Sequence, residues 1–455
     1  MPQLIVKGGV VLVEGDLVRC DVVADEGRIV ALEQSAAGSV ADQVIDATGQ
    51  YVIPGVIDSH VHFREPGYTY KEDFESGSRA AAAGGITMFM DMPNLEPPPN
   101  SVENYRRQRE LAAGKAIVDY NHWGMPTIHE EIPKIAAEGA LGFKFFMKSA
   151  HYPYDGPISI SNNAGILEAF KVIAKTGLPC AVHPHDMQLW EVRLDRMKKS
   201  GRDGTDAWNE VTYGDEDVVE TVAICSLAML AHASGVELRI LHIQGLPQVR
   251  ITRMLKSAGY GFIAETNPWA VFHIDPIAVR GEESAAANWA ALNDGTIDII
   301  GSDHAPHTWS EHQKAMTNTL DSVVAGYPLC EHWLALYLTE INKGRLSLAQ
   351  LSKLASENVA RHLSIFPRKG VIRVGSDADL VVIDMEQESV LGETYPVFSK
   401  IGFTPLAGHE IKGMPVYTIS RGEVVMDHLE VTGAPGRGQF VTHNKVEREA
   451  LAASV

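Results

Sequence analysis

The stretch Gly55-Val-Ile-Asp-Ser-His-Val-His-Phe-Arg-Glu-Pro-Gly67 is the most informative part of the chain and indicates which fold to expect. The apolar residues 51–57 predict a buried strand that leads into His60 and His62. Because side chains alternate along a strand, both imidazoles point to one face, and Arg64 follows on the same parity. Two such histidines suit one half of a metal site. A turn with solvated histidines is the alternative, which only other segments can exclude.

Similar segments recur through residues 55–367, where short apolar runs alternate with helix-like stretches. The strand candidates are Thr87–Met90, Gly142–Phe146, Cys180–His183, Leu238–His242, Gly261–Glu265 and Ile297–Ser302. Helical spacing of apolar residues marks Ala164–Thr176, Val218–Ser234 and Pro247–Ala258. Repeated strand–helix units predict a parallel sheet, and this many favour an α/β fold of the (β/α)8 TIM-like barrel type.

Both ends of the chain carry short β-strand patterns separated by glycine and acidic turns, including a hairpin-like run over Tyr417–Met426. Residues 1–54 and 368–455 are therefore expected to form one small composite β-sandwich domain. This domain would bracket a barrel of residues 55–367.

Composition narrows the range of partners. The 455 residues include 39 Lys and Arg against 58 Asp and Glu, a net charge of −19, which disfavours nucleic acid and anionic membranes as partners. The four cysteines are scattered without a Cys-x-x-Cys pair, as is typical of a reducing compartment. Neither a signal sequence nor an apolar run of membrane-span length is evident, so a cytoplasmic protein acting on a small molecule is expected.

Metal-capable side chains stand at the ends of five strand candidates. They are His60 and His62, Lys144, His183, His242 and Asp303. Each alone has an ordinary structural explanation, since His183 and Asp303 could cap helices and His242 could pack as a core imidazole. Barrel enzymes build their active sites at the carboxyl ends of the strands, so their joint occurrence favours one site.

Lys144 is the hardest of these residues to explain structurally. It stands among aromatic residues on a central strand candidate, and unpaired lysines are rarely buried. In an apolar pocket the pKa of its amine falls, and the neutral amine can add carbon dioxide to become a carbamate. The carbamate could bridge two divalent metals about 3.5–4 Å apart. One metal would take His60, His62 and Asp303, and the other would take His183 and His242.

These residues carry a resemblance to the cyclic amidohydrolases, the group of dihydroorotases, hydantoinases, dihydropyrimidinases and allantoinases. The resemblance extends from the amino-terminal β segment to Gly436-Arg-Gly-Gln-Phe440. It implies a barrel with a composite β-domain, a homo-oligomer (dimer or tetramer), and two divalent metal ions, commonly Zn²⁺, bridged by a carboxylated lysine. The implied ligands are His60, His62, Lys144, His183, His242 and Asp303, all present in the family's order.

Several motifs are most similar to those of dihydroorotases. They are His60-Val-His-Phe-Arg-Glu-Pro-Gly-Tyr, Lys71-Glu-Asp-Phe, Ala83-Gly-Gly-Ile-Thr, Met92-Pro-Asn, Ser302-Asp-His-Ala-Pro-His-Thr308 and Phe398-Ser-Lys. The resemblance implies that Arg64 and Asn94 bind a substrate carboxylate and that His307 also contacts the substrate. Arginine offers a bidentate fork to a carboxylate, although a salt bridge to Glu65 is the alternative.

Other segments depart from the dihydroorotase pattern. His185, Gln244 and Trp269 stand where other residues are usual, and Arg280 is only a tentative substitute for the arginine of a missing Pro-Pro-Leu-Arg segment. These segments line the substrate side of the expected pocket. The ring therefore stays open between dihydroorotate and the substrate of a hydantoinase-like, allantoinase-like or other imide or lactam hydrolase.

The expected reaction is hydrolysis of a cyclic amide. Asp303 would take a proton from the attacking water and return it to the departing nitrogen, so one carboxylate serves as base and then as acid. With dihydroorotate the product would be N-carbamoyl-aspartate. A non-catalytic scaffold with the same fold is the remaining alternative, although such relatives typically lose metal ligands.

Overall fold

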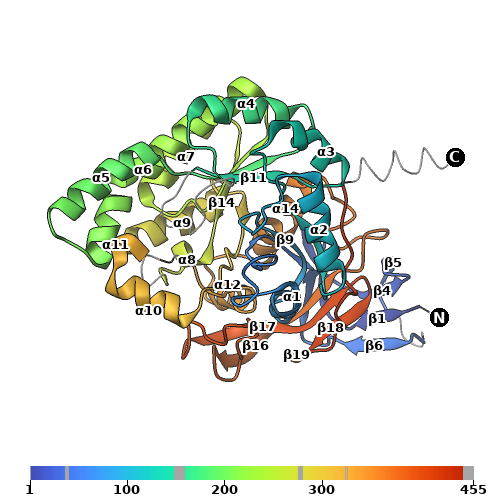
Figure 1. Ribbon diagram of the computed structural model, residues 1–455. Coiled ribbons are helices and arrows are strands. Elements are labelled where there is room, and N and C mark those ends of the chain that lie inside the picture. Colours follow the sequence, from blue (N-terminus) through green and yellow to red (C-terminus); the bar gives the residue numbers. More distant parts are fainter. Residues whose placement is uncertain are drawn as a thin grey trace.

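The computed structural model describes residues 2–35, 40–147, 159–274, 280–322, 324 and 326–443. Parallel strands in the middle of the chain form a closed barrel (Figure 1). They are β8 (Val56–Val61), β9 (Ile86–Asp91), β10 (Asp119–His122), β11 (Phe143–Phe146), β12 (Cys180–His183), β13 (Leu238–Ile240), β14 (Ile263–Thr266) and β15 (Ile299–Ile300). Single bridges from Gly124 to Phe143 and from Val61 to His304 join the two runs of paired strands into one ring. The predicted TIM-like barrel is confirmed.

Every strand predicted for this region is present, and β10 is an additional strand that no sequence pattern indicated. Its residues Asp-Tyr-Asn-His lack an apolar run, yet all four are buried. Asn121 is satisfied inside the fold, because its side-chain amide donates to the carbonyl oxygens of Gly139 at 3.0 Å and Val441 at 2.7 Å. Partners far away in the chain therefore make this polar strand possible.

Helices surround the barrel (Figure 1). They are α1 (Phe74–Ala83), α2 (Val102–Ala113), α3 (Ile132–Ala137), α4 (Asn163–Ala174), α5 (Met187–Lys199), α6 (Thr205–Ser234), α7 (Leu246–Ser257), α8 (Pro268–Val271), α9 (Glu282–Asp294), α10 (Trp309–Thr317), α11 (Thr319–Ser322), α12 (Trp333–Asn342), α13 (Leu348–Ser352) and α14 (Asn358–His362), with short turns at His129–Glu131 and Lys353–Glu357. Several begin at a side chain that accepts from the backbone of the first turn, as Asp73 does for α1.

Helix α6 has the length and hydropathy that would allow a membrane span. Residues 214–217, however, leave the helical conformation, so the element consists of two helices joined at a kink. Ala223, Ile224 and Leu227 of its second half belong to the main hydrophobic core. These features are those of a core helix in a globular protein.

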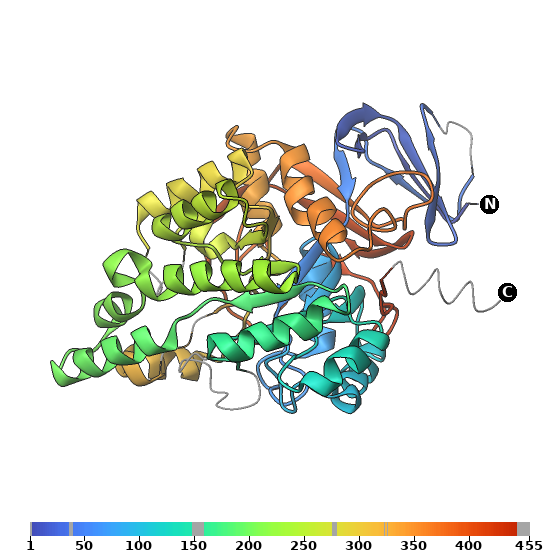
Figure 2. The ribbon, with the colours of Figure 1, turned by 90° about the horizontal axis from the view of Figure 1, so that it is seen from above.

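Strands from both chain ends share a seven-stranded sheet in the order β19-β18-β17-β16-β7-β2-β3. Its strands are β2 (Val10–Val13), β3 (Asp16–Arg19), β7 (Tyr51–Pro54), β16 (Leu380–Val390), β17 (Glu410–Ser420), β18 (Glu423–Asp427) and β19 (Glu430–Val431). A second sheet, β5-β4-β1-β6, holds β1 (Leu4–Lys7), β4 (Asp21–Asp25), β5 (Arg28–Glu33) and β6 (Gln43–Asp46). Figure 2 shows the amino-terminal strands (blue) at the edge of the molecule, far from α5. The exact domain limits stay a prediction.

One buried lysine ties the barrel to these sheets. The Lys369 ammonium lies 2.8 Å from Asp119 Oδ2 at the start of β10, 2.5 Å from Asp379 Oδ2 and 3.1 Å from Asp377 Oδ2. Burial alone would lower the pKa of Lys369, but the three carboxylates raise it. The ammonium is therefore the cation that these acids hold, and Arg421 supplies a second charge to Asp119 at 3.0 Å.

Replacing Lys369 with methionine is expected to lower the free energy of unfolding by about 3–5 kcal/mol, because it leaves buried carboxylates without their cation. Urea denaturation measures this loss. Lys199→Met is the matched control, since its pair with Asp195 is exposed and should contribute only about 0.5 kcal/mol. Equal losses in the two variants would contradict the assignment.

Candidate metal centre

The end of the first barrel strand, β8, and the segment that follows the last one, β15, bring three metal-capable side chains together. Asp303 Oδ1 lies 3.2 Å from His60 Nε2 and 3.5 Å from His62 Nε2. One ligand atom from each of the three lies within 4.8 Å of the others, so the group could hold a metal ion. The two histidines are buried, while the Asp303 side chain is 23% exposed, as an opening to substrate requires. The pairing predicted from the sequence is present in the fold.

Asp58 holds the strands that carry these ligands. Its Oδ1 accepts the backbone N–H groups of His60 and Ser302, each at 3.2 Å. Ser302 follows β15, so one carboxylate oxygen joins the end of the first barrel strand to the end of the last. Asp303 (φ 52°) and His242 (φ 40°) have left-handed backbone, which is strained for these residue types and typical of functional sites.

His183 and His242 form a second group beside the first. His183 Nδ1 and His242 Nε2 are 2.7 Å apart, and the ring centroids are 4.4 Å apart. The ring of His60 is 6.0 Å from that of His242, so the two groups adjoin. Burial keeps the pKa of His242 low, at about 3, and lowers that of His183. Neutral imidazoles are the form that binds metals.

Lys144 completes the set. Its side chain is buried, its Nζ lies 4.0 Å from the ring centroid of Phe146, and it makes no hydrogen bond or ion pair within the described part of the chain. Burial holds the pKa of Lys144 well below its usual range, against the opposing fields of Glu265 and Asp303. A buried amine with a lowered pKa, which interacts electrostatically with His183, His242 and Asp303, fits a carbamate ligand between two divalent cations.

Glu265 and Arg239 support the centre, and sequence reasoning missed both. His60 Nδ1 donates to Glu265 Oε1 at 2.5 Å, while Arg239 Nε donates to Glu265 Oε2 at 2.8 Å. Burial alone would lower the pKa of His60, but Glu265 and Asp303 raise it to about 9. A carboxylate behind a histidine fixes the ring and strengthens it as a ligand. The position of Glu265 at the end of a predicted strand was the available signal.

Asn94 plays a similar part for His62. Its Oδ1 accepts from His62 Nδ1 at 2.7 Å, which turns His62 Nε2 toward Asp303. The Asn94 amide nitrogen is buried and has no partner among the described residues. Asn94 therefore orients a metal ligand and still has a donor to offer a substrate.

The segments that depart from the dihydroorotase pattern connect to one another. Asn267 Nδ2 donates to Asp303 Oδ2 at 3.0 Å, and Asn267 Oδ1 accepts from Gln244 Nε2 at 3.1 Å. The backbone N–H of Gln244 donates in turn to Gln248 Oε1 at 2.8 Å. Asn267 therefore fixes the second oxygen of Asp303, a role that no sequence pattern indicated.

Arg280 lies beyond this network. Its Nη1 and Nη2 pair with Asp217 Oδ2 and Glu220 Oε2, each at 2.8 Å, and its guanidinium stacks 3.7 Å from the ring centroid of Tyr213. Two buried carboxylates neutralise its charge, which argues against the tentative role in substrate binding. His185 and Trp269 are both buried, and His185 Nε2 and Trp269 Nε1 have no partner within the described ranges.

Arg64 and His307 lie together on the substrate side. Arg64 Nη2 is 3.1 Å from His307 Nε2, and both side chains are buried. Glu65, the alternative partner of Arg64, instead pairs with Lys115 at 2.5 Å. All three residues predicted to bind substrate therefore have partners near the candidate centre: Arg64 and His307 contact each other, and Asn94 contacts His62.

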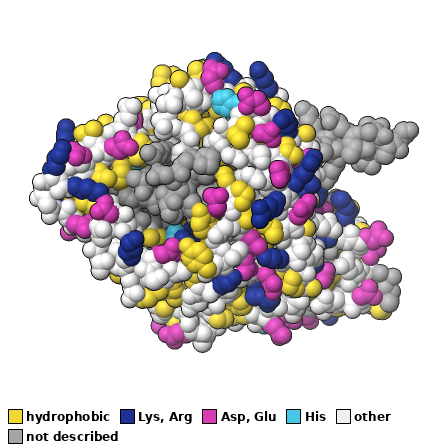
Figure 3. All heavy atoms as spheres, viewed as in Figure 1, with side chains coloured by type: hydrophobic (Ala, Val, Ile, Leu, Met, Phe, Trp, Pro, Cys, Tyr) yellow, Lys and Arg dark blue, Asp and Glu magenta, His cyan; other side chains and the backbone are white. Residues whose placement is uncertain are grey.

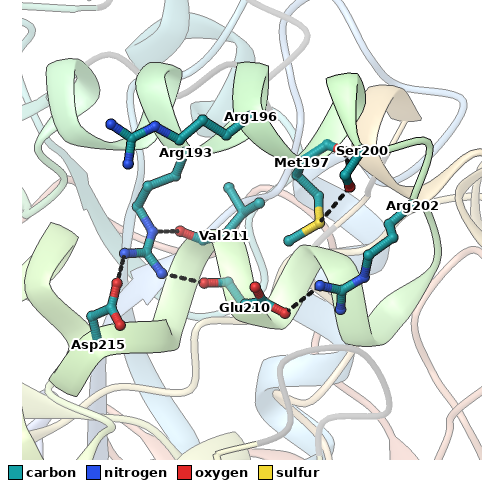
Figure 4. Close-up of a pocket in the computed structure, with 8 residues that line it drawn as sticks. All are labelled: Arg193, Arg196, Met197, Ser200, Arg202, Glu210, Val211 and Asp215. Carbon is teal, nitrogen blue, oxygen red and sulfur yellow. Dashed lines mark hydrogen bonds and ion pairs between the residues drawn. The ribbon is translucent and has the colours of Figure 1, made fainter.

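Within the described part of the chain, the surface away from the centre shows no comparable site. Acidic and basic side chains are interspersed on the face seen in Figure 3. A hollow of about 280 Å³ between α5 and α6 contains none of the predicted site residues (Figure 4). Arg193 Nε donates there to the Val211 carbonyl oxygen at 2.7 Å, and Arg202 pairs with Glu210 at 2.8 Å. These arginines are committed to local acceptors.

Comparisons with known proteins agree with this geometry. Residues 51–425 match the family described as "Amidohydrolase family". The chain is 30% identical to an L-hydantoinase from Paenarthrobacter aurescens (98% of this chain, 99% of that one) and 31% identical to a dihydroorotase from Methanosarcina mazei (97% and 98%). It is also 31% identical to an allantoinase from Rubrobacter xylanophilus (98% and 99%). The solved L-hydantoinase from Arthrobacter aurescens superposes with a TM-score of 0.90 at 29% identity, covering 97% of this chain and 100% of that one.

Proposed function

Because the chain belongs to the amidohydrolase family, we propose that it is a metal-dependent enzyme of the dihydroorotase type, which opens a small cyclic amide by hydrolysis. The observation that supports this most directly is the convergence of His60, His62 and Asp303 at the carboxyl ends of the barrel strands. His183, His242 and Lys144 would complete a centre for two divalent ions, with Zn²⁺ expected and Lys144 carboxylated.

Different residues of the proposed site have different roles in the reaction. Bound divalent cations would polarise the substrate carbonyl and lower the pKa of the attacking water, so that it gives up a proton more readily. Asp303 accepts the proton of the attacking water and delivers it to the departing ring nitrogen. Glu265 and Asn94 hold His60 and His62 in the ring orientations that face Asp303. Asn267 keeps the Asp303 carboxylate from rotating.

Dihydroorotate is the proposed ring because its carboxylate matches Arg64, His307 and the free amide nitrogen of Asn94. A hydantoinase-like or allantoinase-like activity is the second candidate. The overall similarity to L-hydantoinase and the departures at Gln244, Asn267 and Trp269 favour it. A homodimer or homotetramer and a cytoplasmic location complete the proposal.

A substrate panel tests this choice. Metal-loaded protein is expected to hydrolyse dihydroorotate with a kcat/KM at least about 10-fold above that for dihydrouracil, because a charged hydrogen bond contributes about 1.5–3 kcal/mol. Hydantoins and allantoin complete the panel, and metal analysis accompanies it. A neutral hydantoin as the best substrate would favour the second candidate. A purified protein that takes up no metal when metal is supplied, and that hydrolyses none of these rings, would favour a scaffold.

A further inference from the structure

Lys71 is a buried cation that the proposed reaction does not use. It lies between β8 and α1, and its side chain is 1% exposed. Its Nζ is 2.7 Å from Glu311 Oε1 and 3.1 Å from His307 Nδ1. The rings of Tyr68 and Tyr70 lie 5.8 Å and 5.6 Å away. Lys71 therefore stands directly behind a residue of the substrate side.

The contact with Lys71 decides which nitrogen of His307 carries the hydrogen. Burial and the charge of Arg64 lower the pKa of Lys71, and the ion pair with Glu311 opposes that shift in favour of the ammonium form. An ammonium group can only donate. Lys71 Nζ at 3.1 Å is closer to His307 Nδ1 than Glu311 Oε2 at 3.7 Å, which is beyond hydrogen-bond distance, so Nδ1 is assigned as the acceptor. Burial lowers the pKa of His307, and Arg64 lowers it further, so the imidazole is neutral and carries one hydrogen. That hydrogen is left on Nε2.

His307 Nε2 then faces a second donor. Arg64 Nη2 lies 3.1 Å away, and arginine has no acceptor atom. The other end of the Arg64 guanidinium is held by the Pro306 carbonyl oxygen, 3.3 Å from Nε. Two N–H groups that face each other need an acceptor between or beside them, and a carboxylate has two oxygens to provide. Arg64, Lys71 and Glu311 together leave one positive charge in excess, which also favours an anion.

We propose that Lys71 is a positioning residue that holds His307 with its Nε2 hydrogen directed to the substrate side, where His307 and Arg64 together bind the carboxylate of a cyclic amide. This inference rests on the proposed function for the identity of the ligand. It goes beyond that function because it assigns the substrate preference to a lysine that touches no substrate atom. Glu311 acts through Lys71 as its counter-charge.

Binding of a matched pair of planar pyrimidines tests the role of Lys71. Orotate carries a carboxylate that uracil lacks, and calorimetry measures both on the metal-loaded protein. Lys71→Met is expected to weaken orotate binding at least about 10-fold and uracil binding less than about 2-fold, whereas Lys71→Arg, which keeps a charged donor, should recover most of the affinity for orotate. Equal losses for the two ligands, or no recovery with arginine, would overturn the proposal.

Lys115→Met is the matched control. The substitution removes one positive charge that, like that of Lys71, is paired with a carboxylate, here Glu65. The Lys115 side chain is 38% exposed, and within the described residues it makes no contact with His307. It should leave the ratio of orotate to uracil affinity unchanged. The same fall in that ratio as in Lys71→Met would show a general effect of charge and overturn the positioning role.

The tautomer gives a readout that needs neither activity nor a folded variant of Lys71. Long-range ¹H–¹⁵N spectra of the unaltered protein, with His307 assigned by its absence in His307→Asn, should show the hydrogen on Nε2. A hydrogen on Nδ1 would overturn the proposal. Orotate binding that depends on Lys71, without hydrolysis of any ring, would support the positioning role and count against the proposed function alone.

Discussion

Replacing Lys144 with alanine is expected to empty the metal centre and lower kcat/KM by at least about 10³-fold, because metal ions supply several kcal/mol of transition-state stabilisation. The lysine amine is buried, faces the fields of Glu265 and Asp303, and has no partner of its own in the described part of the fold. Without the carbamate that it would form, the imidazoles of His183 and His242 are left without an anionic partner to share a cation.

Elemental analysis of the purified variant measures the expected loss of metal. A small carboxylic acid such as propionate should restore part of both metal content and activity, because it can occupy the space of the missing carbamate. Lys343→Ala is the control, since that side chain is 59% exposed. A Lys144→Ala protein with normal metal content and no response to propionate would refute the bridging role.

Asp303→Asn is expected to lower kcat by about 10²–10⁴-fold, the usual contribution of a positioned acid–base group. Asparagine keeps the shape of the side chain, so Asn267 and the two histidines still surround it. What is lost is the ability to take a proton from water and to return it to the ring nitrogen.

Steady-state kinetics combined with metal analysis separates that loss from simple release of metal. Asp294→Asn is the matched control, because that carboxylate is 45% exposed at the end of α9 and, among the described residues, pairs with Arg253 and the Thr296 turn. An Asp303→Asn protein that keeps its metals and more than about a tenth of its activity would exclude Asp303 as the proton carrier.

The sequence was sufficient to predict the barrel and the grouping of His60, His62 and Asp303. The recurring apolar runs predict the strands, and metal-capable side chains stand where those runs end. The barrel fold then brings the strand ends together. The sheet shared by both chain ends was likewise signalled by short strands and turns.

What the sequence could not show depends on contacts between distant residues. The polar side chains of β10 are satisfied by Lys369, by Arg421 and by the carbonyl oxygens of other segments. Glu265 is a partner of His60 although the two residues are 205 positions apart in the sequence. Arg280 was a reasonable candidate for a substrate anion until the fold placed Asp217 and Glu220 against it.

The hydrogen bonds of Asp58 have a consequence for the order of events during synthesis. One of them joins Asp58 to Ser302, which is 244 positions away, and so links the ends of the first and last strands of the barrel. A nascent chain that has emerged only as far as α7 already contains all four histidines proposed as metal ligands. It still lacks Asp303 and the contact between the first and last barrel strands that brings Asp303 to them. High contact order makes such a closing step late and slow. Metal uptake at His60 and His62 should thus report completed folding, which would protect a growing chain from trapping a metal in a half-built barrel.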